Sequence, residues 1–180
     1  EVPWDSTTQT PRHNPLEKLP VLLLEDGGSV YESRFILEWI EAKHPEPPML
    51  PEDLDARLFA RRVEVVVDGV CDALVALFWE RNRDPDKQSA EWQARQMRKV
   101  DGGMRALAEW AGTRAFVVGE RFGLADIATG TVCRYLDVRF PDYPWRRNHP
   151  DLSDYSDRME RRPSFQGSVP VAQRISDKVV

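Results

Sequence analysis

The sequence has few of the residues that build disulfide frameworks and metal sites. It contains only two cysteines and three histidines in 180 residues. Cys71 and Cys133 are far apart, and each lies in an apolar pattern with helical spacing, which is typical of buried thiols in a reducing compartment. No CxxC pair and no paired His/Cys spacing occurs. We therefore expect neither a disulfide scaffold nor a structural zinc site, and no metal cofactor.

Long apolar runs and an excess of basic charge are also lacking. No apolar run approaches the roughly 20 residues of a membrane-spanning helix, and no basic-then-apolar leader opens the sequence. The formal net charge of −5 argues against nucleic acid or an anionic membrane as the main partner. The composition, with 41% hydrophobic and 31% charged residues, is that of a soluble globular protein. A cytoplasmic protein is the expectation.

Residues 19–33, LPVLLLEDGGSVYES, combine strand, turn and helix signals. The apolar run Val21–Leu24 is long enough for a buried strand and too short for a helix. Asp26-Gly27-Gly28 is a turn signal, and Ser29–Tyr31 can return as a second short strand. Apolar residues then recur at helical spacing, which predicts a helix from about residue 33 to residue 43.

Glu32 and Ser33 lie at the expected entrance of that helix. A helix entrance has unpaired N–H groups and the positive end of the helix dipole, so it attracts carboxylates. Ser33 can serve as the N-cap and also offer its hydroxyl to an anion, while Glu32 suits a ligand ammonium. Together they could recognise the α-amino acid end of a ligand. An ordinary capped helix with a surface glutamate explains the same pattern.

Beyond residue 44 the sequence predicts a proline-rich linker and then helices. Four prolines fall between residues 45 and 51, which neither a helix nor a central strand tolerates. Helical spacing predicts one helix from Leu54 to about residue 81, capped by Asp53, and another over about 86–110. Gly69 suggests a close approach of another backbone or a bend. Gly102-Gly103 weakens the second helix, so a packing contact should compensate there.

A further helix start is marked by Gly123-Leu124-Ala125-Asp126. Asp126 can accept a hydrogen bond from the Gly123 amide, which gives half of a capping box. The helix is expected to run to about Val138, residues 139–145 to break it, and a last helix to run from Asp151 to just before Pro163. We interpret Asp126 as a folding element and not as a catalytic acid.

These segments, in this order, resemble the cytosolic glutathione S-transferases. The likeness rests on Leu19-Pro20, on Tyr31-Glu32-Ser33, on Gly119–Ala128 and on Arg162–Phe165; Tyr135–Pro141 looks most like the bacterial YibF-like branch. The resemblance implies an α/β thioredoxin-like domain that binds glutathione, incomplete here, over residues 1–44. A linker over 45–51 and an all-helical domain over 52–180 would follow.

The resemblance also implies roles for individual residues. The Leu19 backbone, a cis Pro20, Glu32 and Ser33 would bind glutathione, with the Glu-Ser pair at its γ-glutamyl end. Asp68 would reach the glutathione of a partner subunit in a homodimer; a polar residue on a solvated helix face explains it equally well. Three residues late on the first long helix could line the substrate cleft, although spacing favours a core position for the first of them: Phe78, Trp79 and Arg81.

The activity implied is transfer of the glutathione thiolate to a small apolar electrophile. In such enzymes a Ser, Tyr or Cys just after the first strand activates the thiol. The sequence begins at Glu1 without an initiator methionine, and that strand with its neighbours, roughly 35–45 residues, is expected to precede it. The catalytic residue is therefore unknown. The alternatives are a non-catalytic, partner-binding or stress-related relative, and a helical scaffold with no ligand.

Overall fold

The computed structural model describes residues 7–172. The chain divides into two compact units, Glu1–Met49 and Leu50–Val180, which are described separately below. The division falls inside the proline-rich segment 45–51. The outer ends of the two expected domains, 1–44 and 52–180, lie outside the described residues, and those domain limits stay a prediction.

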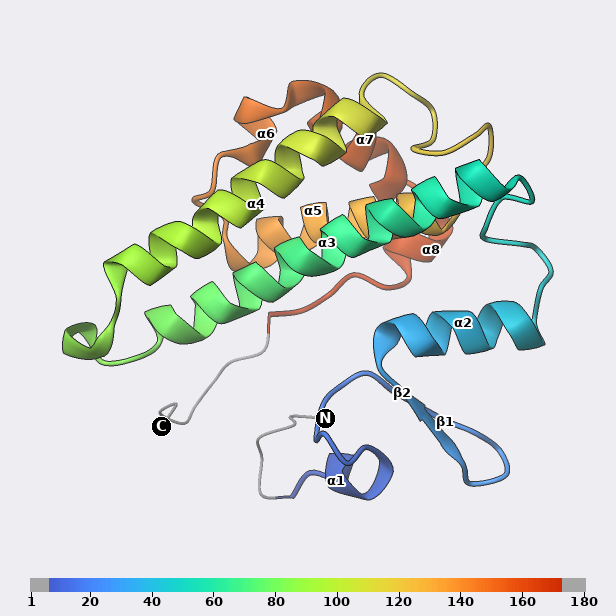
Figure 1. Cartoon of the computed structure of the whole chain (residues 1–180), viewed down its shortest axis with the longest axis horizontal. Helices are drawn as coiled ribbons and strands as arrows, with labels where there is room; N and C mark the ends of the chain where they lie inside the picture. Colours follow the sequence, from blue (N-terminus) through green and yellow to red (C-terminus); the bar gives the residue numbers. More distant parts are fainter. Residues whose placement is uncertain (1–6, 173–180) are drawn as a thin grey trace. The chain divides into compact units, whose positions relative to one another are not determined.

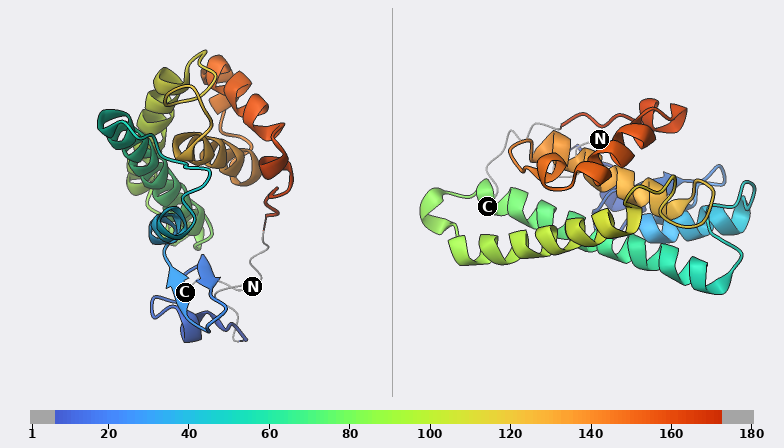
Figure 2. Two further views of the ribbon diagram at one scale, coloured as in Figure 1. Left: turned by 90° about the vertical axis from the view of Figure 1, so that its right-hand side faces the viewer. Right: turned by 90° about the horizontal axis from the view of Figure 1, so that it is seen from above.

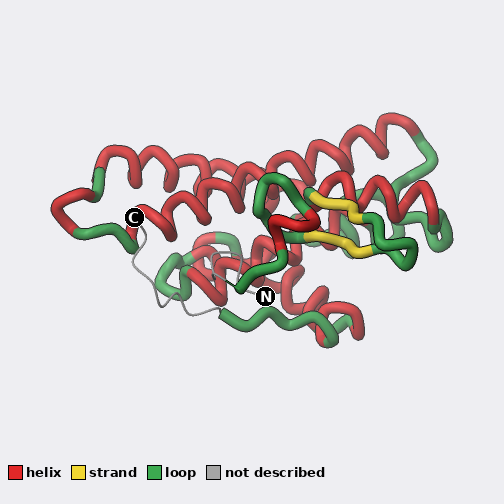
Figure 3. The backbone as a smooth tube through the Cα atoms, turned by 90° about the horizontal axis from the view of Figure 1, so that it is seen from below, coloured by secondary structure: helices red, strands yellow, loops and turns green. Residues whose placement is uncertain are grey.

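The first unit is a β-hairpin followed by a helix. Strands β1 (Val21–Leu23) and β2 (Ser29–Tyr31) pair antiparallel, and helix α2 (Ser33–Lys43) packs on both of them (Figure 1). The hairpin is the pair of strands drawn in yellow in Figure 3. Gly27 has φ +85°, a conformation that glycine adopts without steric cost, and this lets the chain reverse. The expected strand–turn–strand–helix order is confirmed.

A short helix lies in the segment that precedes the hairpin. Helix α1 (Thr10–His13) is a single turn that packs on β1. Its N-terminal residues include Pro11, whose fixed φ suits the first turn, and the Asn14 amide closes it by donating to the Thr10 carbonyl at 2.9 Å. One turn is too short to give a periodic sequence signal.

The second unit is all helical and is built on two long helices. Helices α3 (Leu54–Arg81) and α4 (Ala90–Ala111) lie side by side along most of their length (Figure 2). Helix α5 (Leu124–Arg139) packs on α3, and α7 (Pro150–Glu160) packs on α4 and α5. Two single-turn helices complete the described part of the unit: α6 (Trp145–Asn148) and α8 (Pro163–Gln166).

The ends of the long helices follow their caps. The Asp53 carboxylate accepts from the Ala56 amide at 2.8 Å, so α3 begins where the sequence predicts. Helix α4 begins about four residues later than expected. Pro85–Lys87 forms a separate 3-10 turn, the chain is extended at Gln88, and the Ser89 hydroxyl accepts from the Trp92 amide at 3.2 Å.

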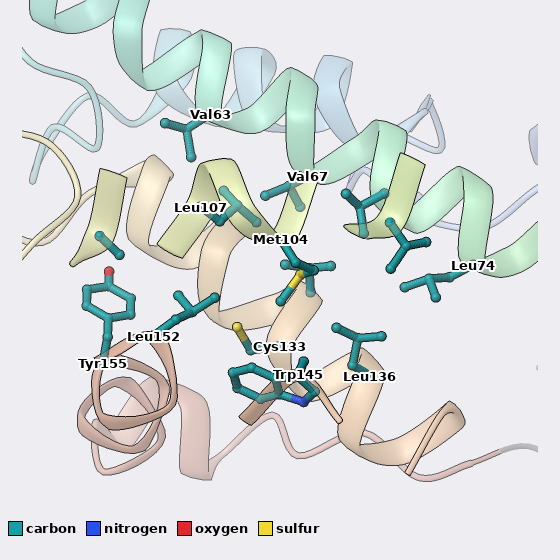
Figure 4. Packing of buried hydrophobic residues seen from close by; sticks show 14 of the residues in the cluster. Val63, Val67, Leu74, Met104, Leu107, Cys133, Leu136, Trp145, Leu152 and Tyr155 are labelled. Atoms are coloured by element: carbon teal, nitrogen blue, oxygen red, sulfur yellow. The ribbon is translucent and has the colours of Figure 1, made fainter. Parts of the chain in front are cut away.

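The apolar core lies almost wholly in the helical unit. Apart from Val30, every buried hydrophobic side chain among the described residues belongs to residues 60–159. Val67 and Leu74 of α3 belong to one buried cluster with Met104 and Leu107 of α4 and Leu136 of α5 (Figure 4). These faces follow the 3.6-residue period that marks the helices in the sequence.

The close approach between the long helices occurs at Gly103. A Cβ atom at this position would lie 2.2 Å from Val70 Cγ2, whereas nothing lies within 4 Å of a Cβ built at Gly69 or at Gly102. The expected packing contact of the Gly102-Gly103 pair is thus confirmed for Gly103. The expected backbone approach at Gly69 is wrong, because the contact is made by its neighbour Val70.

Asp126 ties three parts of the helical unit together. Its carboxylate accepts from the Gly123 amide at 2.8 Å, from the Val117 amide at 2.8 Å, and from the Tyr155 hydroxyl of α7. Burial and the Asp126 charge raise the pKa of Tyr155, so this hydroxyl stays a donor. The half capping box expected at Gly123 is confirmed, and Asp126 is a buried structural acid.

Helix α6 occupies part of the expected break over residues 139–145 and continues beyond it. The Arg146 guanidinium donates to Asp137 at 2.7 and 3.1 Å and to Asp157 at 2.9 Å, and the Trp145 indole N–H donates to Asp137 at 2.9 Å. Side-chain contacts therefore hold a turn whose own four residues carry little helix signal. Within residues 7–172, no helix is both long and apolar enough to cross a membrane.

Candidate functional site

One end of the hairpin brings four of the predicted site residues together. Val21 pairs with Tyr31 in the register of the two strands. Pro20 immediately precedes that pair and Glu32 immediately follows it, so both lie at the same end, next to Leu19 and Ser33. The Leu19–Pro20 peptide bond is cis, as the resemblance implies. Pro20 lacks an N–H group, which suits a position at the start of an edge strand.

Asn14 organises the loop that leads into Leu19. This side chain is 2% exposed; its amide group donates to the Lys18 carbonyl at 2.8 Å, and its oxygen accepts from the Leu16 amide at 2.9 Å. The Ser29 hydroxyl adds a tie by donating to the His13 carbonyl at 2.8 Å. Asn14 is a positioning residue that our sequence reasoning did not single out. The Asn14-Pro15 pair, a turn signal, was the available clue.

Glu32 has an unusual backbone conformation. It has φ +72° and ψ +123°, a combination that residues with a Cβ atom rarely adopt. Its carboxylate accepts from the Arg34 amide at 3.1 Å, so Glu32 and not Ser33 is the N-cap of α2. The expectation of Ser33 as the N-cap is therefore wrong. The carboxylate is exposed at the open end of the hairpin, where a ligand ammonium could reach it.

Ser33 is the first residue of α2. Its hydroxyl lies 3.3 Å from Glu32 Oε1, to which it donates, and no described residue accepts a hydrogen bond from its amide N–H. The α2 dipole adds partial positive charge at this position. Ser33 thus offers its amide N–H to a carboxylate, beside the negative charge of Glu32, and its hydroxyl becomes a second donor once it turns away from Glu32 Oε1. Such a pair of groups can bind both charges of an α-amino acid.

Asp68 lies in the helical unit, on α3. It is half-buried and close enough to Cys71 to help raise the pKa of that thiol. Its predicted contact with glutathione stays a prediction.

The three residues that were predicted to line the substrate cleft lie at the C-terminal end of α3. Arg81 lines a pocket of about 260 Å³ together with residues of α4 and of the segment that follows α5. Phe78 is half-buried, and the Arg139 guanidinium lies 4.9 Å from its ring centroid. Trp79 packs edge-on against Phe78 with ring centroids 5.5 Å apart. Neither Phe78 nor Trp79 lines this pocket, so the structure places only Arg81 there.

The two thiols are poor nucleophiles. Burial, followed by the charges of Asp68 and Asp72, raises the pKa of Cys71 to about 12. Burial raises the pKa of Cys133 still further. Because the thiolate is the reactive form, neither cysteine suits catalysis at neutral pH. No group of three or more potential metal ligands occurs in the part of the chain that the structure describes.

The fold and the hairpin site define a two-part protein with a thioredoxin-like segment and a helical domain. Two family models match it: the glutathione S-transferase N-terminal domain over residues 1–43 and the C-terminal domain over residues 90–158. The uncharacterised GST-like protein YibF of Escherichia coli is 30% identical over 170 residues, which are 94% of this chain and 84% of that protein. The chain therefore belongs to the glutathione S-transferase family, and its likeness to the YibF-like branch is confirmed.

Two further relatives extend the comparison. A probable maleylacetoacetate isomerase of Drosophila melanogaster is 30% identical over 169 residues, covering 89% of this chain and 68% of that protein. A crystal structure of a glutathione S-transferase from Methylobacterium radiotolerans, in complex with glutathione sulfonate, is 61% identical. It superposes with a TM-score of 0.97 over 100% of this chain and 85% of that one. The expected fold class, a thioredoxin-like part followed by a helical domain, is confirmed.

Proposed function

We propose that this protein binds glutathione through the hairpin end and transfers its thiolate to a small apolar electrophile. The observation that carries the proposal is the juxtaposition of Glu32 and Ser33 with the cis Leu19–Pro20 bond. Ser33 binds the α-carboxylate of the γ-glutamyl residue, and Glu32 binds its ammonium. The backbone of Leu19, a residue that is 44% exposed, pairs with the cysteinyl part of glutathione. The glutathione-bound relative at 61% identity supports this assignment.

The reaction itself is a nucleophilic displacement. The glutathione thiol loses its proton, the thiolate forms a carbon–sulfur bond with the electrophile, and the leaving group departs with the electron pair. Since burial raises the pKa of both cysteine thiols, glutathione is the proposed source of the sulfur nucleophile. Cytoplasmic location is part of the proposal, because reduced glutathione is held in that compartment.

A glutathione-dependent isomerase is the second candidate. It rests on the relative named as a probable maleylacetoacetate isomerase, which has the same identity to this chain as YibF. In that reaction glutathione is not consumed, so product analysis separates it from a transferase.

Calorimetric titration with glutathione tests the binding step. We expect Ser33→Ala to weaken binding about 10- to 100-fold, because the variant loses the charge-assisted contact of the hydroxyl and keeps only that of the amide N–H. Glu32→Ala should also weaken binding. Glu25→Ala is the matched control, since it removes an exposed carboxylate of the same unit without a contact at the hairpin end. No binding to the unaltered protein would contradict both candidate functions.

A conjugation assay tests whether the protein transfers the glutathione thiolate. With glutathione and an activated aryl halide, a transferase releases halide in step with the loss of free thiol. Glutathione binding without conjugation or isomerisation would favour the non-catalytic, partner-binding alternative.

The proposal includes a homodimer. Leu54, Leu58 and Val65 of α3 are 66%, 58% and 53% exposed. Their spacing of four and seven residues places them on one face of the helix. An apolar stripe of this kind suits a second copy of the chain, and Asp68 lies one turn beyond Val65.

A further inference from the structure

Four arginines lie where the end of α7 meets the segment that joins α4 to α5. Three of them belong to the end of α7 and the turn after it, and the fourth belongs to the joining segment: Arg158, Arg161, Arg162 and Arg114. All four are part of the helical unit. We call them the arginine patch. Neither of the two candidate functions uses these residues.

Contacts within the helical unit hold three of these arginines without neutralising them. The Arg158 guanidinium donates to the Arg114 carbonyl at 2.7 Å, which brings the two residues next to each other. The Arg114 guanidinium donates to the Trp110 carbonyl at 2.9 Å. The Arg162 guanidinium lies 3.8 Å from the Phe122 ring centroid. A guanidinium that contacts a carbonyl or a ring keeps its positive charge and has further N–H groups to offer.

The acidic residues around the arginine patch leave it positively charged. Residues 112–123 and 155–165 contain five arginines and three acidic residues. Two of the acids, Asp157 and Glu160, already pair with arginines outside these segments, at 2.9 and 2.6 Å, and the third is Glu120. Among the described residues, no carboxylate forms an ion pair with any arginine of the patch. Since the whole chain carries a net charge of −5, this positive charge is a local feature.

The spacing of the arginines suits an extended acidic peptide. Arg114 and Arg161 are exposed, and Arg158 and Arg162 are half-buried. Arg162 follows Arg158 by four residues, which is about 6 Å along the direction of α7. In an extended peptide, the side chains on one face belong to every second residue and lie about 6.6 Å apart. Carboxylates at alternate positions of such a peptide therefore match the two arginines.

We propose that the arginine patch binds an extended acidic segment of a partner protein. Carboxylates on one face of this segment accept from the guanidinium groups of Arg158 and Arg162, and Arg114 and Arg161 flank them. The planar fork of guanidinium donors matches the two oxygens of a carboxylate. The contacts described above hold the arginines before the partner arrives, which lowers the entropic cost of binding.

A purely structural role for the arginines makes a different prediction. The end of α7 favours cations because of the helix dipole, and the ring contact of Arg162 stabilises the fold. Asp154 lies four residues before Arg158, the spacing of a helical ion pair, yet the two side chains do not pair. If the arginines only stabilised the fold, their substitution would lower stability and no acidic peptide would bind.

Fluorescence anisotropy with a labelled peptide tests the proposal. The probe is an octapeptide with blocked ends and an uncharged label, in which glutamate and serine alternate. The comparison peptide has glutamine in place of each glutamate. We expect the glutamate peptide to bind, and the glutamine peptide to bind at least ten-fold more weakly. Raising the salt concentration from about 50 to about 300 mM should weaken binding of the glutamate peptide, because salt screens exposed charges.

Variants of one exposed arginine locate the peptide. Arg161→Glu should weaken binding at least ten-fold, and Arg161→Gln should weaken it less. No described residue contacts the Arg161 side chain through a hydrogen bond or ion pair, so we expect both variants to fold. The matched control is Arg95→Glu, which makes the same change in net charge at an exposed position about 22 Å along α4 from Trp110. It should change binding less than two-fold.

Three results would overturn the proposal. The first is a glutamate peptide that fails to bind at millimolar concentration, or that binds no better than the glutamine peptide. The second is equal weakening by Arg161→Glu and Arg95→Glu, because the peptide would then respond only to net charge. The third is tighter binding of phosphatidylserine vesicles or duplex DNA than of the glutamate peptide, because the partner would then not be a protein segment.

Discussion

At the scale of single residues, the site depends on one strained backbone position. Glu32 has φ +72° and ψ +123° and also provides the carboxylate that caps α2. Holding a residue with a Cβ atom in such a conformation costs about 1–3 kcal/mol. The strain places the carboxylate of Glu32 and the N–H and hydroxyl groups of Ser33 side by side at one point of the chain.

Substitutions at Glu32 should separate the strain from the charge. We expect Glu32→Gly to be more stable than Glu32→Ala by about 1 kcal/mol or more, because both lose the cap but only alanine keeps the steric conflict. Urea denaturation of the two variants measures this difference. Both should bind glutathione more weakly than the unaltered protein. Equal stabilities would mean that the backbone at residue 32 relaxes at no cost.

The sequence was informative for residues whose role depends on neighbours close to them in the sequence. The Asp26–Gly28 turn, the Asp53 cap and the Asp126 contact with the Gly123 amide follow from short patterns and are confirmed. Contacts made through space were not accessible in this way. No spacing rule relates Asp126 to Tyr155, and none relates Arg81 to Phe140. The roles of the predicted site residues stay predictions.

At the scale of elements, the crossing of α3 and α4 requires a residue without a side chain. The stiff, buried side chain of Val70 occupies the space beside Gly103. Gly103→Ala should therefore lower the free energy of unfolding by about 1–3 kcal/mol through overpacking. Gly102→Ala, with open space around the new methyl group, should raise it by up to about 1 kcal/mol.

Chemical denaturation of these two neighbouring variants provides the measurement, and each serves as the control for the other. A stabilising Gly103→Ala would show that the two helices can separate at this point without loss. Sequence reasoning could predict that the glycine pair needed a packing contact. It could not predict which glycine makes the contact, because this depends on the rotation of α4 against α3.

The turn between α3 and α4 is held by one carboxylate. Glu80 accepts from the Ser89 amide at 2.7 Å and from Arg83 at 3.0 Å, and these contacts, the amide first, lower the pKa of Glu80 below its usual 4.5. Because the pKa of Glu80 is lower in the folded state, its carboxylate contributes fully to stability at pH values above the unfolded-state pKa. This contribution is lost as the pH falls through the folded-state value.

We therefore expect Glu80→Gln to be less stable than the unaltered protein at pH 7. The difference in stability between the two proteins should narrow as the pH falls below about 4.5, the ordinary pKa of this glutamate in the unfolded chain. Thermal denaturation across this range measures the effect. Lys87→Gln is a suitable control, since its exposed pair with Asp84 lies in the same turn. A difference that does not depend on pH would mean that the Glu80 charge is not what holds the turn.

At the scale of the whole molecule, the exposed apolar stripe on α3 predicts the oligomeric state. Leu58 is 58% exposed at the centre of this stripe. We expect analytical ultracentrifugation to give the mass of a dimer, and Leu58→Glu to give a monomer, because burying an unpaired charge is costly. Trp92→Glu, at a partly exposed position on α4, is the control and should remain dimeric. A strict monomer would remove the proposed role of Asp68 across the interface.

The general architecture could be predicted from the sequence because its signals are long and periodic. The 28 residues of α3 and the proline-rich segment before it leave few alternatives. The single-turn helices α1, α6 and α8 could not be predicted, since four residues make no period and their stability comes from contacts such as that of Arg146 with Asp137. Arg81 was predicted to line a cleft, but the other residues of its pocket were not, because three separate segments form it.

The three hydrogen bonds of Asp126 have a consequence for synthesis on the ribosome. The chain emerges from its N-terminus, so the Val117 and Gly123 amides are available to Asp126 well before the Tyr155 hydroxyl. Until α7 has emerged, this carboxylate lacks one of the three donors that it has in the folded protein, and α5 lacks the cover that α7 provides. The helical unit therefore cannot complete its fold during translation until the segment that contains Tyr155 has left the ribosome.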